Sequence, residues 1–291
     1  MINSKKSKMR NSLSGFRGKK VGKFFINIFL IIFTIIQIFP LIWLVLFSLK
    51  SNSEIFGGNI IGLPAKFLWE NYRQAFVGGK VGLYFINSFI VTGLTIVFSG
   101  ILASMASYAI ARMKWFFSKT VLMIFLAGMM IPIHAALLPL FIILKNLNIL
   151  NSPLALIIPY TAFALPIAIF VLTTFLRTIP RELEEAALLD GCNVYQVFFK
   201  IILPILKPAL ATVSILTYIA SWNELMFAVT FISKEQYRTL TVGIMSMVGQ
   251  YSTNWGPIGA GLVIATLPTI VIYIMLSKQV QKSLISGSVK G

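Results

Sequence analysis

Acidic residues, histidine and cysteine are scarce in this 291-residue sequence, which has 8 Asp and Glu residues, one His and one Cys. The single cysteine, Cys192, excludes an intrachain disulfide and a metal site built from cysteines. The sequence also lacks the Gly-x-x-x-x-Gly-Lys-Ser/Thr pattern that cradles nucleotide phosphates and the His-Glu-x-x-His pattern that binds zinc. We therefore expect no catalytic residues, no metal site and no cofactor in this chain.

Charge of both signs is low, because charged residues make up 11% of the chain and hydrophobic residues 57%. Soluble domains have about 25% charged and 45–50% apolar residues. This composition predicts a membrane protein. A net charge of +17 could suggest nucleic-acid binding. The basic residues are instead dispersed between the hydrophobic runs, as in a membrane topology signal, so we expect no nucleic-acid partner.

Six hydrophobic runs are long enough to cross a bilayer, which takes about 20 residues of helix. They occupy residues 24–49, 84–111, 120–144, 153–176, 209–232 and 257–277. The first run is too long for a secretory signal and lacks a small-residue cleavage site, so it is expected to remain as a helix. The predicted fold class is all-α, a polytopic membrane protein with six transmembrane helices.

Basic residues are unevenly divided between the two sides of this topology. Segments 1–23, 112–119, 177–208 and 278–291 hold 18 Lys and Arg residues, and the other connections hold 7. The positive-inside rule places the richer side, with both termini, in the cytoplasm. The predicted parts are a basic cytoplasmic arm (1–23), a first span with an external loop (24–83), a membrane core (84–277) and a cytoplasmic tail (278–291).

The 177–208 loop is the only long polar stretch between hydrophobic runs that contains a carboxylate cluster. Pro180 suits the first turn of a helix, and acidic residues there favour the positive end of the helix dipole, so a helix is predicted over about 180–190. Gly191 can adopt the left-handed conformation that follows a helix, and Asn193 suits the N-cap of a second helix. Helices this short are marginal in water, so we expect them to dock against the membrane body or a partner.

The spacing of residues in this loop resembles the EAA loop of ABC importer permeases. Every signature position is filled: Glu185, Ala186, Ala187, Gly191, Ile201, Leu203 and Pro204, with Asp190 directly before the glycine. In that family the loop forms a coupling helix that sits in a cleft on an ATPase subunit. The resemblance implies a type I ABC importer permease fold, ABC ATPase subunits that bind and hydrolyse ATP, a second permease subunit in a heterodimer and an extracellular solute-binding protein.

Shorter matches point to the substrate class. Residues 69–73 (Trp-Glu-Asn-Tyr-Arg), Asn87-Ser88 and the tail 287–291 are similar to segments of sugar-importing permeases of the maltose-type second permease family. The resemblance implies translocation of a mono- or oligosaccharide across the cell membrane by alternating access. An ABC importer for another solute, such as glycerol phosphate, a polyol or an amino acid, is the alternative. A secondary transporter or a channel is more remote, because neither needs such a loop.

The fifth run contains Glu224, the only acid in any run, on a stripe with Ser214, Thr217, Tyr218 and Ser221. This spacing gathers polar groups on one helix face, away from lipid, and an acid in a membrane is by default a functional-site hypothesis. The alternative is that Glu224 only pins two helices together. The sequence 221–224 also resembles a helix of sugar permeases that borders the translocation path. The candidate path residues are Tyr218, Ser221, Trp222, Asn223 and Glu224.

Prolines predict bent helices in the third run, near Pro132 and Pro139, and in the fourth, at Pro159 and Pro166. His134 lies in the third run without a second titratable group nearby in sequence. We expect it to pack against other side chains, with no proton relay.

The topology predicts that Cys192 faces the cytoplasm. A membrane-impermeant maleimide should therefore leave Cys192 unlabelled in intact cells and label it in inverted vesicles that lack the ATPase. Ready labelling from outside intact cells would reverse the orientation.

Overall fold

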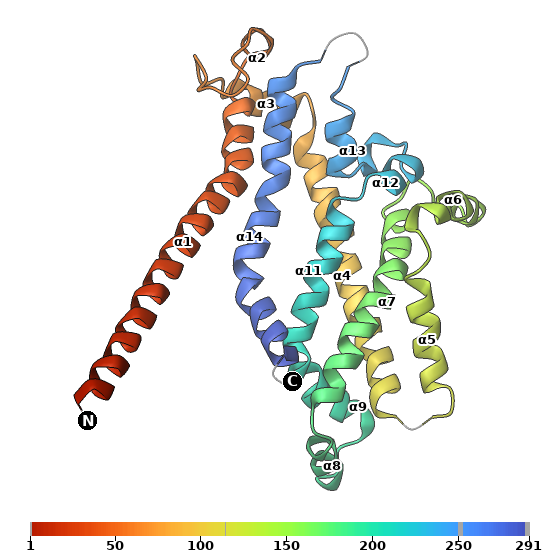
Figure 1. The fold of residues 1–291 in the computed structure, drawn as a ribbon. Coiled ribbons are helices and arrows are strands. Elements are labelled where there is room, and N and C mark those ends of the chain that lie inside the picture. Colours follow the sequence, from red (N-terminus) through yellow and green to blue (C-terminus); the bar gives the residue numbers. More distant parts are fainter. Residues whose placement is uncertain (1, 114, 250–252, 289–291) are drawn as a thin grey trace.

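A computed structural model describes the backbone of residues 2–113, 115–249 and 253–288, and the side chains of 23–113, 115–249 and 253–275. Every element of regular structure in these residues is a helix, as the composition predicts. Figure 1 shows long helices side by side with short helices at both ends. The long helices are α1 (Ile2–Ser48), α4 (Val81–Arg112), α7 (Leu154–Thr178), α11 (Lys207–Trp222) and α14 (Trp255–Ser288).

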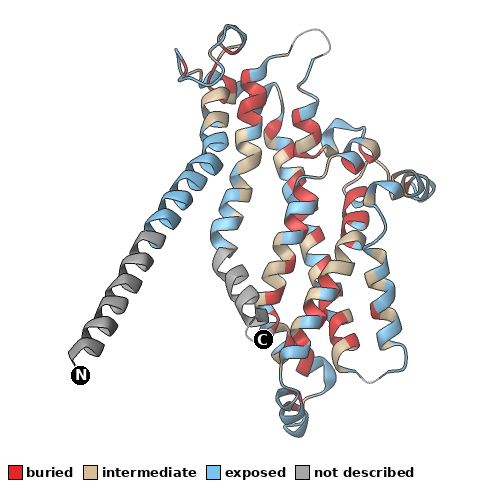
Figure 2. Cartoon of the chain, viewed as in Figure 1, coloured by how far each residue is buried: buried red, intermediate tan, exposed pale blue. Residues whose placement is uncertain are grey.

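Helix α4 lies at the centre of the bundle, where it packs against α7 and α11. Small residues make this close approach possible: Ser99, Ala103 and Ser107 recur every four residues and are fully buried. The hydroxyl of Ser107 donates a hydrogen bond to the Ile169 carbonyl of α7, at 3.2 Å. Figure 2 shows the buried residues concentrated where these helices face one another.

The third predicted run is broken. Helix α5 (Ser118–Gly128) ends before Pro132, and the chain resumes in η1 (Ile133–Ala136) and α6 (Leu137–Asn146) at an angle of 91° to α5. This confirms the bend predicted there. Helix α7, in contrast, continues through Pro159 and Pro166 without a break.

The prediction of one continuous fifth helix over 209–232 is wrong. Helix α11 ends at Trp222, and a separate short helix, α12 (Met226–Phe231), follows. The segment Val194–Ile205 meets α11 at 71°. Among the described residues, four helices are long and apolar enough to cross a membrane alone, and counting each of the two bent pairs as one span gives up to six, the number predicted.

Helices α1 and α14 continue into the segments predicted as the arm 1–23 and the tail 278–291. Residues 289–291 of the tail match lie outside the described part of the chain. Helix α1 stands apart from the bundle over most of its length (Figure 1), and the side chains of residues 23–42 are exposed. A surface this apolar belongs in hydrocarbon or against another membrane helix.

Buried polar side chains hold the chain after α1 to the bundle. The Lys50 side chain is fully buried, and its Nζ donates to the carbonyls of Asn59, at 2.6 Å, and Ile60, at 3.2 Å. Asn71, in α3 (Glu70–Val77), donates through Nδ2 to the carbonyls of Ser48 and Lys50. Its place in the 69–73 motif thus has a structural reason, since it satisfies carbonyls where α1 ends.

The beginning of α4 is joined to η3 (Glu235–Tyr237) near α13 (Leu240–Met245). Lys80 forms an ion pair with Glu235 at 2.9 Å, and the Tyr84 hydroxyl donates to the same carboxylate. The Asn87 side chain donates to two carbonyls of the same connection, and Ser88 accepts from the Leu240 N–H. The Asn87-Ser88 match therefore marks the joint between α4 and this connection.

The Lys80–Glu235 pair predicts a pH dependence. The hydrogen bond from Lys80, then that from Tyr84, lowers the pKa of Glu235 below its ordinary 4.5, and the hydrogen bond to Glu235 raises the pKa of Lys80 above 10.5. A lowered carboxyl pKa adds stability above 4.5 that is lost as pH falls through the folded-state pKa. A raised lysine pKa adds stability that is lost as pH rises through its folded-state value.

We expect the wild-type protein to unfold at a higher temperature than Glu235→Gln at neutral pH, with the difference vanishing in acid below 4.5. Thermal unfolding of the purified protein across this pH range measures it. Glu70→Gln is the control, since it removes a pair between neighbouring turns whose side chains are 75% and 52% exposed. A difference between wild type and Glu235→Gln that does not change with pH would contradict the prediction.

Candidate functional site

The 177–208 loop folds as two short helical segments at one end of the bundle (Figure 1): α8 (Glu182–Leu189), then α9 (Val194–Val197), the π-helical turn η2 (Phe198–Ile202) and α10 (Leu203–Ile205). Gly191 has φ of 84°, the left-handed conformation expected there. Asn193 caps α9 through reciprocal hydrogen bonds with Gln196, both at 2.9 Å. The backbone conformation of Gly191 and the N-cap at Asn193 therefore agree with the prediction from the sequence.

The two faces of α8 differ. Its inner face buries Glu184 and Ala187. Three of its leucines are exposed, with Leu183 47%, Leu188 51% and Leu189 89% exposed. The signature residues divide in the same way. Glu185, Ala186, Asp190 and Pro204 are exposed, whereas Ala187, Ile201 and Leu203 contact the bundle.

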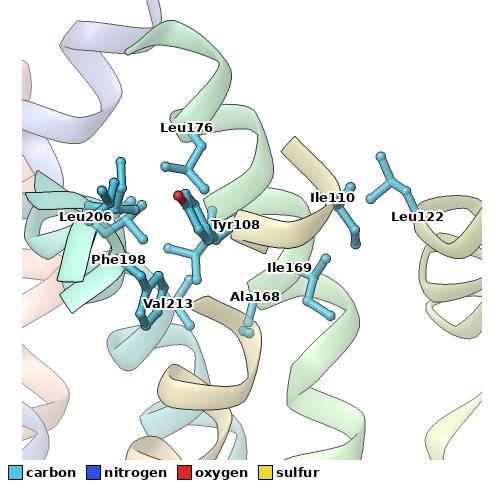
Figure 3. Packing of buried hydrophobic residues seen from close by; sticks show 14 of the residues in the cluster. Tyr108, Ile110, Leu122, Ala168, Ile169, Leu176, Phe198, Leu206 and Val213 are labelled. Atoms are coloured by element: carbon cyan, nitrogen blue, oxygen red, sulfur yellow. The ribbon is translucent and has the colours of Figure 1, made fainter. Parts of the chain in front are cut away.

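The second segment is anchored in the core between α4 and α7. Val197, Phe198 and Ile202 are buried there, and the Phe198 ring lies 5.4 Å from that of Tyr108. Figure 3 shows this contact, with Leu176 of α7 close by. The loop thus has one segment fixed in the core of the bundle and one, α8, most of whose residues are exposed.

Glu224 lies in the break between α11 and α12, where its carboxylate has three donors. The Tyr160 hydroxyl donates to Oε2 at 2.6 Å, and the backbone N–H groups of Phe227 and Ala228 donate to Oε1 at 2.9 Å and Oε2 at 3.1 Å. A carboxylate here satisfies N–H groups at the start of α12 that have no partner within the helix. Glu224 therefore both caps α12 and joins it to α7.

A cavity of about 120 Å³ lies beside this carboxylate, between α7 and α11. Tyr160, Thr217, Ser221 and Glu224 supply its polar groups, and Phe163 is among its apolar walls. The Thr217 hydroxyl is buried and has no hydrogen-bond partner among the described residues. At about 30 Å³ per water, the space holds roughly four water molecules or a small polar group.

The other candidate path residues point elsewhere. Trp222 donates from Nε1 to the Ala265 carbonyl at 3.1 Å, and the Tyr218 hydroxyl lies 3.0 Å from that of Thr269, so both side chains face α14. Their rings stack with centroids 5.5 Å apart. Asn223 is exposed and bonds back to Ile219. The structure thus brings Ser221 and Glu224 together at the cavity and separates Tyr218, Trp222 and Asn223 from it.

Residues 96–285 match the family model described as a binding-protein-dependent transport system inner membrane component. The chain belongs to this family. It is 37% identical over 271 residues to the probable ABC transporter permease protein YurM of Bacillus subtilis, covering 93% of this chain and 90% of that protein. It is 35% identical to the sulfoquinovosyl glycerol transport system permease protein SmoH of Agrobacterium fabrum, covering 87% and 89%.

The trehalose transport system permease protein SugB of Mycobacterium tuberculosis is also 35% identical, with coverage of 87% and 92%. The fold matches the crystal structure of a bacterial ABC transporter involved in the import of the acidic polysaccharide alginate. That match has a TM-score of 0.78 at 23% identity and covers 90% of this chain and 97% of the other. The resemblance to permeases indicated by the loop spacing is confirmed, and so is the fold class.

Tyr160 is a residue beside Glu224 that the sequence did not indicate as part of a functional site. It lies in an apolar run, 64 positions before Glu224, and no local pattern marks it as polar. His134 packs edge-on against Phe227, with ring centroids 6.1 Å apart, which agrees with a packing role.

Glu224→Ala removes the acceptor of three donors, and hydrogen bonds to charged groups contribute about 1.5 to 3 kcal/mol each. We expect lower solute uptake from a complex that still assembles. Glu224→Gln keeps one acceptor oxygen and should fall between wild type and alanine. Uptake and subunit recovery are measured together in membrane vesicles.

Ser51→Ala is the matched control, since it removes another N-cap, that of α2 (Asn52–Phe56), away from the cavity. Normal uptake by the assembled Glu224→Ala complex would leave Glu224 a packing role only.

Proposed function

We propose that this permease is the membrane-spanning subunit of an ATP-driven ABC importer that moves a mono- or oligosaccharide inward by alternating access. Family membership supports the transport role. The carbohydrate substrate is supported by relatives named for sulfoquinovosyl glycerol and trehalose, each 35% identical to this chain.

The observation that carries the proposal is the exposure of α8. Leu183, Leu188 and Leu189 are exposed at the end of the bundle, on the helix that also carries the exposed Glu185 and Ala186 of the signature. Exposed apolar side chains that gather in one region mark interaction sites. An ATPase subunit that accepts α8 in a cleft would cover them. ATP is bound and hydrolysed in that partner, and this chain contributes no catalytic residue.

The cavity beside Glu224 is proposed to border the translocation path. Hydroxyl groups of Thr217 and Ser221, a carboxylate and the aromatic rings of Tyr160 and Phe163 suit the mixed polar and apolar faces of a sugar. Among the described residues that line the cavity there is no Lys or Arg, the side chains that bind phosphate most strongly. This lining supports a sugar over glycerol phosphate.

The remaining partners follow from the same assignment. A companion permease would complete a heterodimer in the cell membrane and cover membrane-facing surface. An extracellular solute-binding protein would deliver the sugar at the α13 end, where a hollow of about 510 Å³ is lined by Glu70, Arg73, Gln74 and Asn254 among others. Both termini are then cytoplasmic, in agreement with the distribution of basic residues.

Gly191→Val tests the proposal. Valine at φ of 84° is strained by about 1 to 2 kcal/mol. That strain should displace α8 and lower ATPase affinity, or its coupling to transport, by a factor of about 5 to 30. Sugar uptake should fall while membrane insertion and abundance persist. Glu185→Ala should act in the same direction but more mildly, because one hydrogen bond contributes about 0.5 to 1.5 kcal/mol.

The measurements are sugar uptake and recovery of the ATPase with the purified complex. Gly93→Val is the control, because Gly93 has ordinary helical backbone and an added Cβ there meets nothing within 4 Å. Normal uptake and full ATPase recovery for Gly191→Val would remove the main support for the importer assignment.

A further inference from the structure

Glu184, on the inner face of α8, forms an ion pair with Arg112, the last residue of α4. Arg112 Nε lies 2.8 Å from Glu184 Oε1, and the two side chains are only 6% and 12% exposed. Neither atom has a hydrogen-bond partner among the described residues, so charge attraction alone joins them. Replacing either residue would therefore leave the charge of the other without its partner.

The other ion pairs of the described residues differ in kind. Arg73–Glu70 and Lys80–Glu235 have side chains that are half exposed or more. Exposed pairs contribute little because water and salt screen them. Removing one member of a buried pair instead leaves an uncompensated charge away from water, which is strongly unfavourable. Arg112–Glu184 is the one buried ion pair in the described part of the chain.

Further contacts join the same end of α4 to the 177–208 loop. Arg112 Nη2 donates to the Ile179 carbonyl at 2.8 Å, so one guanidinium holds both the chain entering α8 and α8 itself. Tyr108, one turn earlier on α4, interacts with the Glu184 carboxylate and packs on Phe198 of the second segment (Figure 3). The end of α4 thus contacts the chain before α8, α8 itself and the second segment.

Helix α4 leads away from this joint along the bundle over 32 residues. It packs along α7 and α11, and its first turns hold Glu235 and the connection to α13. A displacement of α8 that moves Arg112 therefore moves a helix that runs to the opposite end of the bundle.

We propose that Arg112 and Glu184 are a pair of positioning residues that makes α8 and α4 move together, so that closure of the ATPase on α8 is passed to the membrane helices through α4. The proposal rests on the proposed function, since it requires an ATPase on α8. It predicts that loss of the pair uncouples hydrolysis from transport while the outer face of α8 still binds the ATPase.

The test uses the whole complex, with its ATPase and companion permease, reconstituted in proteoliposomes. ATP hydrolysis, sugar uptake and ATPase recovery are measured on the same samples, with thermal unfolding. For Glu184→Gln and Arg112→Gln we expect full ATPase recovery and continued hydrolysis, with a loss of most of the sugar moved per ATP. The double variant should be no worse than either single variant, because both remove the same link.

Arg112→Lys is the conservative variant. It keeps the charge but not the two-pronged hold on Ile179 and Glu184, so part of the lost sugar-to-ATP ratio should return. The exchanged pair Arg112→Glu with Glu184→Arg should also exceed either single charge removal. Lys119→Gln, which removes an exposed charge from the same end of the bundle, is the control and should match wild type.

The outcomes separate the two hypotheses. An unchanged sugar-to-ATP ratio in Glu184→Gln and Arg112→Gln, with or without a lower unfolding temperature, would reduce the pair to a stabilising contact and overturn the proposal. The importer assignment would stand in that case, because the wild-type complex would still couple. Failure of the wild-type chain to recover an ATPase would instead remove the proposed function.

Discussion

Every backbone N–H and C=O in an apolar layer needs a hydrogen-bond partner, and a helix supplies partners only along its interior. Where a helix of this permease stops, other backbone groups, water or side chains have to take over. Glu224 does so at the break between α11 and α12, where it accepts from two N–H groups of α12 and from Tyr160. The position of α12 depends on that carboxylate.

The need for hydrogen-bond partners at helix ends also explains other buried or conformationally unusual polar residues. Asn151, itself left-handed with φ of 57°, accepts through Oδ1 from the Ser233 and Lys234 N–H groups just beyond α12. Lys50 and Asn71 satisfy carbonyls where α1 ends. Conversely, the Thr217 hydroxyl is buried with no such task among the described residues, which makes it the better indication of contact with a solute or water.

The parts of the structure that the sequence predicts are those governed by neighbours in the chain. Gly191 and Asn193 could be interpreted correctly because a helix end and an N-cap are decided within a few residues. The break after Trp222 could not be predicted from the sequence, because no proline or glycine lies there. The Tyr160 hydroxyl that stabilises the break comes from another helix. Likewise, three glutamates stand in the first turn of α8, and only the tertiary position of Arg112 selects Glu184 as the buried one.

Each end of α4 forms an ion pair, and the two pairs differ in their exposure to water. Lys80–Glu235 is exposed, so water and salt weaken it and the contact can yield at little cost. Arg112–Glu184 is buried, and separating it would strand both charges away from water. A force applied at α8 would therefore break the Lys80–Glu235 contact before the Arg112–Glu184 contact. The hydrogen bonds of Asn87 and Ser88 also join α4 to the connection before α13, so in the coupling proposed above α4 would stay with the 177–208 loop and lose only this charge contact.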